Sequence, residues 1–257
     1  VTFAFGNPSE VKSLPVATLV PATATSVAVK AGAVAVASSM SQYPALTNAM
    51  RSRSRSTIRR IDGDCTRPAE RALVRQGYVV VIPDYRLFPE VQFPEFVNDS
   101  AAALRWTFDN IGQYGGDPSN VFVMGHYDES YLRLAGTQQR PCGFIGLSGP
   151  YDFLPLVGGP LEQIFPQATR ASSQPINFVT GDEGPALLVH GYLDNTVKPR
   201  NSAKLAELVT AAGGQAQLII VPKRQHASIV LSLARPLSWL APVADDVHVF
   251  IGKNRCP

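Results

Sequence analysis

A chain of 257 residues with 45% hydrophobic and 17% charged residues is long enough to bury a large core and has the composition of a folded globular protein. This composition excludes a disordered chain, and the lack of any apolar run of about 18 residues excludes a membrane-spanning helix. The formal net charge of +3 at pH 7 comes from one local patch and not from general basicity.

The first quarter of the chain has few regular patterns. Residues 25–39 (TSVAVKAGAVAVASS) form an apolar run that predicts a strand, and no clean period follows up to residue 65. Residues 51–60 (RSRSRSTIRR) hold five arginines and no acidic residue. A nucleic-acid-binding face would need Lys and Arg spread over it, with aromatic residues or a recognised module. Because these are lacking, we predict a solvated loop here and no nucleic-acid partner.

From residue 78 onward, strand-like and helix-like segments alternate. Tyr78–Tyr85 (YVVVIPDY) is a continuous apolar run rich in valine, typical of a strand covered on both faces. The next segment predicts a helix, because apolar residues recur at helical spacing at Val97, Ala101, Leu104, Phe108 and Ile111. We expect Gly112 to end this helix.

The same alternation continues to the end of the chain. Further strands are predicted at residues 120–124, 143–149, 185–191 and 216–221. Further helices are predicted at residues 201–214, ended by Gly213 and Gly214, and at residues 245–252. Residues 150–180 are rich in Pro, Gly and Ser, and we expect a cap-like insertion there.

This order of elements predicts an α/β fold with a mostly parallel central sheet and helices on both faces. No break in composition and no internal repeat divides the chain, so we expect one domain over residues 1–257. Open sheets of this kind bind ligands at the edge formed by the carboxyl ends of their strands.

Three of the predicted strands end in residues that suit nucleophilic catalysis. Residues 120–124 lead into Gly125-His126-Tyr127, residues 185–191 are followed by Asp194, and residues 216–221 by His226. Because parallel strands end at one edge, we expect these loops to lie close together. A nucleophile position, an acid and a histidine in this chain order match the order of the α/β-hydrolase triad.

The sequence around these loops resembles a known family. Residues 84–126 carry, in order, the elements D-Y-R-L-x-P-E, F-P, N-I and Y-G-G-D-P, and residues 148–156 and 190–214 form two further blocks. In these blocks the chain resembles the α/β-hydrolase carboxylesterases related to hormone-sensitive lipase and the bacterial feruloyl-esterase-like group.

The resemblance implies an α/β-hydrolase fold and a carboxylic ester hydrolase of the Ser-His-Asp type, acting on a small-molecule ester without a cofactor. It assigns the acid to Asp194 and the base to His226. The residues alone leave a second interpretation open, because the sequence Leu193–Thr196 (LDNT) is also typical of a turn.

The nucleophile elbow departs from the family pattern G-x-S-x-G. The five positions are Gly125, His126, Tyr127, Asp128 and Glu129, so Tyr127 stands at the nucleophile position and the second glycine is absent. A phenol with a pKa of about 10 is a poor acyl carrier at neutral pH. Ser130 is the alternative nucleophile, although it lies about one helical turn further on.

The oxyanion hole departs as well. The family places H-G-G-x after an early strand, where backbone N–H groups face the developing negative charge. The nearest counterpart is the stretch of residues 30–33 (KAGA). The predicted donors are therefore the N–H groups of Gly32, Ala33 and Asp128.

Two functions remain open from the sequence. One is a carboxylesterase in which Tyr127 or Ser130 stands at the nucleophile position. The other is a non-catalytic relative that binds a small ligand or a partner in the same pocket. An RNA- or membrane-contacting role for residues 51–60 is the weakest alternative. Apolar residues at Phe153, Leu154, Leu156 and Phe165 suit either an acyl pocket or the core.

The remaining histidines and the cysteines indicate no metal. His126, His190 and His248 have no HExxH or similar spacing, and the three cysteines (Cys65, Cys142 and Cys256) form no CxxC pair. We expect structural or free thiols, since so few cysteines do not favour a disulfide scaffold. The first ten residues show no signal-peptide pattern, which slightly favours the cytoplasm and leaves the compartment open. The oligomeric state is not indicated.

Overall fold

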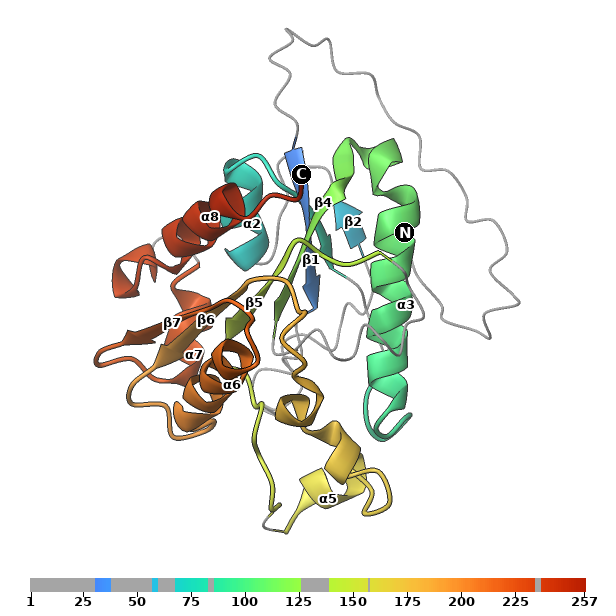
Figure 1. The fold of residues 1–257 in the computed structure, drawn as a ribbon, viewed down its shortest axis with the longest axis vertical. Coiled ribbons are helices and arrows are strands. Elements are labelled where there is room, and N and C mark those ends of the chain that lie inside the picture. Colours follow the sequence, from blue (N-terminus) through green and yellow to red (C-terminus); the bar gives the residue numbers. More distant parts are fainter. Residues whose placement is uncertain are drawn as a thin grey trace, which may run out of the picture.

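The computed structural model describes residues 31–37, 57–59, 68–82, 86–125, 139–156, 158–233 and 237–257. Its centre is a seven-stranded sheet in the order β2-β3-β1-β4-β5-β6-β7 (Figure 1). The strands are β1 (Ala31–Ala37), β2 (Thr57–Arg59), β3 (Val79–Ile82), β4 (Gly116–Gly125), β5 (Gly143–Leu147), β6 (Ala186–Gly191) and β7 (Ala216–Val221). Every neighbouring pair is parallel except β2 and β3. The predicted mostly parallel α/β fold is confirmed.

Helices cover both faces of this sheet. On one face lie α2 (Pro68–Arg75), α7 (His226–Leu231) and α8 (Val243–Lys253), and on the other lie α3 (Glu95–Asn110) and α6 (Arg200–Ala211). Neighbouring residues of a strand point to opposite faces, so β4 sends Phe122 towards α8 and Val121 towards α3. Strands β5 and β6 are buried along their whole length, which explains their continuous apolar sequence.

The end of α3 differs from the prediction. The α-helix ends at Asn110, and the chain continues as the 3₁₀-helix η1 (Ile111–Tyr114). Gly115, with φ of 80°, then reverses the chain, and its N–H donates to the carbonyl of Gly112. The expected stop at Gly112 is therefore wrong. Ending this segment needs a residue in the left-handed region, and Gly115 is the glycine that adopts it.

Residues 51–60 also differ in part from the prediction. Thr57–Arg59 form strand β2, which pairs antiparallel with β3 at the edge of the sheet, with Ile58 opposite Val81. A solvated loop is therefore wrong for these three residues. The rest of the arginine-rich run lies outside the described residues.

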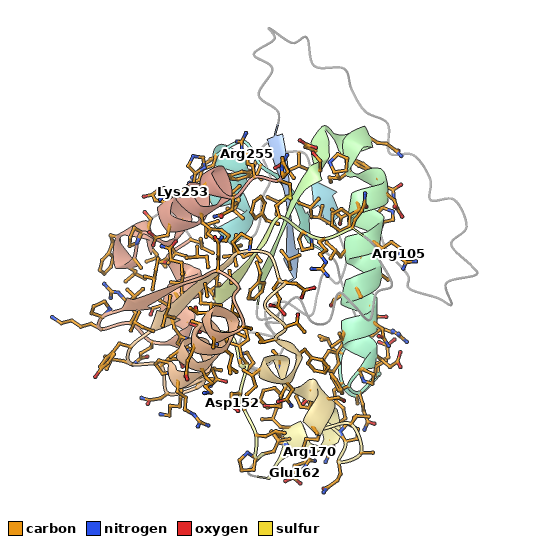
Figure 2. The ribbon with its side chains drawn as sticks, viewed as in Figure 1. Arg105, Asp152, Glu162, Arg170, Lys253 and Arg255 are labelled. Carbon is orange, nitrogen blue, oxygen red and sulfur yellow. A yellow bond between two sulfur atoms is a disulfide. The ribbon has the colours of Figure 1, made fainter. Side chains whose placement is uncertain are left out.

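The segment of residues 150–180 begins where β5 ends. It contains the short helices α5 (Pro160–Ile164), η2 (Ala171–Ser173) and η3 (Pro175–Phe178). It lies beyond the end of the sheet towards which β1 points (Figure 1), with Asp152, Glu162 and Arg170 at this end of the molecule (Figure 2). The segment thus sits at the carboxyl edge of the sheet.

Two buried side chains hold the start of this segment. The Asn201 Oδ1 atom, on α6, accepts hydrogen bonds from the backbone N–H groups of Tyr151 and Asp152, at 2.9 and 2.7 Å. The Gln174 Oε1 atom accepts from Phe153 and Leu154 in the same way, at 2.8 and 3.2 Å. These bonds replace the strand pairing that the backbone loses where it leaves the sheet.

A disulfide lies at the opposite side of the sheet, where the parallel strands have their amino ends. Cys142, immediately before β5, is bonded to Cys256, which follows α8, and their Cα atoms are 5.3 Å apart. Lys253 and Arg255 mark this end of the molecule in Figure 2. The expectation of unbonded thiols is therefore wrong for Cys142 and Cys256, whose separation of 114 residues hides their proximity. Cys65 lies outside the described residues.

Among the described residues, no helix has both the length and the apolar character that crossing a membrane requires.

Candidate active site

The loops that follow β6 and β7 run side by side at the carboxyl edge. The Tyr192 N–H donates to the Val221 carbonyl at 3.0 Å, and the Leu193 N–H donates to the Arg224 carbonyl at 2.8 Å. Gly191 makes this approach possible, because a Cβ atom there would lie 2.5 Å from the Arg224 carbonyl oxygen. The two predicted loops are therefore held together by backbone hydrogen bonds.

Asp194 lies at the centre of this arrangement and is only 2% exposed. Its Oδ1 atom accepts hydrogen bonds from the backbone N–H groups of Thr196 and Val197, both at 2.9 Å, as in an Asx turn. Its Oδ2 atom faces His226. The turn and the interaction with the histidine coexist, because each uses a different oxygen of the carboxylate.

His226 is the first residue of α7 and is 9% exposed. Its Nδ1 atom lies 2.7 Å from Asp194 Oδ2. The start of α7 is fixed by a capping box, in which the side chains of Gln225 and Ser228 each accept the other residue's backbone N–H. A carboxylate can only accept, so the Nδ1 atom of neutral His226 carries the proton and the Nε2 lone pair can act as a base.

A second histidine contacts the same carboxylate. His190, the penultimate residue of β6, is fully buried, and its Nε2 atom lies 3.2 Å from Asp194 Oδ2 and 2.9 Å from the Val197 carbonyl oxygen. Its Nδ1 atom lies 2.7 Å from the hydroxyl oxygen of Ser202. Burial lowers the pKa of His190 below its ordinary value. No sequence pattern assigned His190 to the site, and the only signal was its place four residues before Asp194.

The predicted nucleophile position follows β4 in the sequence. Gly125, the last residue of β4, pairs with Ala37 of β1 on one side and with Gly146 of β5 on the other. The chain thus leaves the sheet at the same carboxyl edge as the loops of Asp194 and His226. Tyr127, Asp128 and Ser130 lie outside the described residues, so their predicted roles stay predictions.

The two early oxyanion donors are not at this edge. Gly32 pairs with Asp117 and Ala33 with Val121, near the amino end of β1, whereas Ala37 pairs with Gly125 at its carboxyl end. With a rise of about 3.3 Å per residue, four or five residues separate these positions by roughly 13–17 Å. The prediction for Gly32 and Ala33 is therefore wrong, since donors after this strand would have to follow Ala37.

Ser148 has an unusual conformation that the sequence did not indicate. It follows β5, its φ is 52°, and its buried Oγ atom has no hydrogen-bond partner among the described residues. Left-handed backbone at a non-glycine residue is strained, and such strain is concentrated at functional sites. The side chain is fully buried, however, so a substrate cannot reach it as a nucleophile.

Aromatic side chains pack between the 150–180 segment and the amino end of α3. Phe165 contacts three other rings, with centroid distances of 5.1 Å to Phe153 and 5.9 Å to both Phe93 and Phe96. Phe93 is buried and the other three are partly buried. This cluster joins two of the predicted acyl-pocket residues, Phe153 and Phe165, to the amino end of α3, while Leu154 and Leu156 are partly buried.

Metal binding is not indicated by the side chains in this part of the structure. Among the described residues, no group of three or more His, Cys, Asp or Glu is arranged to hold a metal ion.

Two family models match separate parts of the sequence. A model of the α/β-hydrolase fold matches residues 60–127, and a model of the prolyl oligopeptidase family matches residues 162–245. The first match ends at Tyr127, the predicted nucleophile position, and the second contains Asp194 and His226. Together the two matches contain all three strand ends that form the candidate site.

Curated relatives are esterases. An isoprenylcysteine α-carbonyl methylesterase of Arabidopsis thaliana is 21% identical over 193 residues, which is 62% of this chain and 45% of the relative. The carboxylesterase NlhH of Mycobacterium tuberculosis is 28% identical over 193 residues, which is 62% of this chain and 59% of the relative. The chain thus spans about half the length of the curated relatives that it matches.

Solved structures share the fold. A truncated carbohydrate esterase from gut microbiota has a TM-score of 0.67 at 20% identity, covering 89% of this chain and 87% of that one. An esterase of Pyrobaculum calidifontis has a TM-score of 0.63 at 17% identity, covering 89% of this chain and 78% of that one. At these identities the likeness concerns the fold.

Proposed function

Because this chain belongs to the α/β-hydrolase carboxylesterase family, we propose that it hydrolyses small carboxylic esters by acyl-enzyme chemistry. The observation that carries the proposal is the distance of 2.7 Å between Asp194 Oδ2 and His226 Nδ1. With the proton on Nδ1, the second nitrogen of His226, Nε2, is the basic atom of the ring. The curated relatives support an ester as the substrate class.

In the proposed reaction, His226 Nε2 removes the proton from a nucleophilic hydroxyl as its oxygen bonds to the ester carbonyl carbon. The imidazolium that forms is stabilised by the Asp194 carboxylate. The bond to the alcohol oxygen then breaks, and His226 donates its proton to the departing alcohol. Water repeats the sequence on the acyl-enzyme, which releases the acid and restores the enzyme.

The nucleophile is proposed to come from the loop that follows Gly125. Ser130 is the hydroxyl that this proposal favours, because the phenol of Tyr127 is a poor acyl carrier and lies far from its own backbone. Ser130 would serve only if the elbow is shifted along the chain. The Asp128 N–H remains the proposed oxyanion donor, joined by N–H groups after Ala37 in place of Gly32 and Ala33.

A fluorophosphonate probe tests the nucleophile directly. The purified protein is labelled, and the tryptic peptide Trp106–Arg133 is sequenced by mass spectrometry. We expect an adduct on Ser130 that is lost in His226→Ala and kept in His248→Ala, a histidine on α8 bonded to Tyr78. Unlabelled peptide together with no turnover of p-nitrophenyl acetate would overturn the proposal.

A non-catalytic relative is the second candidate, and one observation favours it. Tyr127, Asp128 and Glu129 replace the small residues that the family places at the elbow, which would make the pocket bulkier and more acidic. Such a protein would bind a small ligand without hydrolysing it. The unlabelled outcome above, followed by binding of an ester that is recovered intact, would support this candidate.

A further inference from the structure

His190 is a second histidine in contact with the Asp194 carboxylate, beside His226. We propose that His190 is a positioning residue, whose neutral ring donates from Nε2 to Asp194 and fixes that carboxylate towards His226. The contacts behind it are the 3.2 Å approach of His190 Nε2 to Asp194 Oδ2 and the 2.7 Å approach of His226 Nδ1 to the same oxygen.

The neighbours of His190 determine where its proton lies. Both atoms near Nε2, the Val197 carbonyl oxygen and Asp194 Oδ2, can only accept, so Nε2 must carry a proton that it shares between them. The atom near Nδ1 is the hydroxyl oxygen of Ser202, which can donate. Neutral His190 therefore accepts at Nδ1 from Ser202 and donates at Nε2.

Burial keeps His190 neutral, although two of the groups that face it favour its charged form. Asp194 approaches from the loop after β6 and His226 from the start of α7, while Ser202 and Val197 contribute only neutral groups. Burial lowers the pKa of His190 most strongly and His226 also lowers it, while the Val197 carbonyl and the Asp194 carboxylate raise it without offsetting the effect of burial. His190 stays neutral when His226 accepts a proton during turnover. The negative charge of Asp194 therefore stabilises only the protonated His226 ring.

The arrangement joins α6 to the base through a chain of hydrogen bonds. Ser202, fully buried on α6, contacts His190, His190 contacts Asp194, and Asp194 contacts His226. The Asx turn restrains Oδ1, and the two histidines restrain Oδ2. Rotation of the carboxylate would break contacts at both oxygens, so its orientation does not depend on His226 alone.

The kinetic consequence rests on the proposed ester hydrolysis, whereas the hydrogen-bond arrangement does not. Long-range proton–nitrogen spectra of the four histidine rings read the arrangement without turnover. We expect His190 to be the Nε2–H form, and the Nδ1–H proton of His226 to be downfield and slow to exchange. A His190 ring protonated at Nδ1 would overturn the inference even if esters are hydrolysed.

Two variants separate positioning from packing. His190→Phe keeps an aromatic ring but removes the donor, and His190→Gln retains an N–H group for Asp194. We expect His190→Phe to shift or broaden the His226 Nδ1–H signal and to lower kcat by roughly tenfold to a hundredfold, with KM changed by less than about threefold. His190→Gln should restore most of the signal and the rate.

The matched control is His248→Phe, the same substitution at a histidine that does not contact Asp194. His248 lies on α8 and bonds to the hydroxyl of Tyr78. This control should leave the His226 signal and kcat unchanged. If His190→Phe folds and also leaves both unchanged, the inference is wrong. If His190→Phe does not fold, the spectra of the wild-type protein and of His190→Gln test the inference. A His190 ring protonated at Nδ1, or loss of the His226 signal in His190→Gln, would then overturn it. If no ester is turned over but these signals behave as expected, the proposed hydrolysis fails and the positioning role stands.

Discussion

The two oxygens of the Asp194 carboxylate have different partners. Oδ1 closes the turn after β6, and Oδ2 faces two histidine rings. Backbone N–H groups therefore hold Asp194 at one oxygen while its other oxygen interacts with His226. A substitution can therefore remove the interaction with the histidines and keep the turn.

Asp194→Asn tests this division at the residue scale. The amide oxygen can still close the turn, but an amide N–H in place of Oδ2 opposes the Nδ1–H group of His226 and favours the wrong tautomer. We expect kcat to fall by roughly a thousandfold or more, with an unchanged circular dichroism spectrum. Asp109→Asn, at an exposed position of α3, is the control and should keep full activity. Equal losses in both variants would contradict the assignment.

The buried ring of His190 should make the free energy of unfolding depend on pH. Burial lowers its pKa below the ordinary 6.5, so the unfolded chain binds a proton at this ring before the folded protein does. The free energy of unfolding should therefore be highest above about pH 6.5 and fall as the pH drops towards the folded-state pKa, by up to about 1.4 kcal/mol per pH unit. Urea unfolding at several pH values measures this slope. His190→Gln, which cannot titrate there, should show a shallower slope, and an unchanged slope would exclude His190 as its source.

At the scale of elements, α6 supports the carboxyl edge in two places. Asn201 on its first turn holds the backbone where β5 passes into the 150–180 segment, and Ser202 contacts His190. The same helix packs on β5 and β6 through Leu205 and Val209. Displacement of α6 would therefore disturb both the contacts of His190 with the Asp194 loop and the start of the 150–180 segment.

Asn201→Ala tests this support. It leaves the N–H groups of Tyr151 and Asp152 without their acceptor, and the first of these is buried. We expect the free energy of unfolding to fall by about 2–4 kcal/mol, measured by urea denaturation. Asn195→Ala, which removes a side chain from an exposed loop position, should change it by less than about 0.5 kcal/mol. A loss of similar size in the two variants would argue against a specific role for Asn201.

At the scale of the whole molecule, the disulfide joins the amino end of β5 to the residues after α8. The cross-link spans 114 residues and so restricts a large part of the unfolded chain. It lies at the edge opposite the candidate site. Its loss should therefore act on stability and not on the geometry around Asp194.

The double variant Cys142→Ser/Cys256→Ser tests this expectation. We expect the free energy of unfolding to fall by about 2–4 kcal/mol, with kcat at room temperature changed by less than twofold. Alkylation of the denatured wild-type protein before and after reduction should reveal two additional thiols after reduction. Equal alkylation before and after would mean that these cysteines are not bonded in the purified protein.

The sequence alone determined the parts of this protein that depend on local patterns. Continuous apolar runs predicted β3, β5 and β6, because strands covered on both faces have no polar side. The order of the strand ends predicted that Asp194 and His226 would lie together, since parallel strands end at one edge. The tertiary structure decided what depends on residues far apart: the Cys142–Cys256 bond, the contact of His190 with Asp194, and the place of Gly32 at the amino end of β1. Backbone propensity and periodicity report only on neighbouring residues, whereas these three features follow from strand register and from packing between elements.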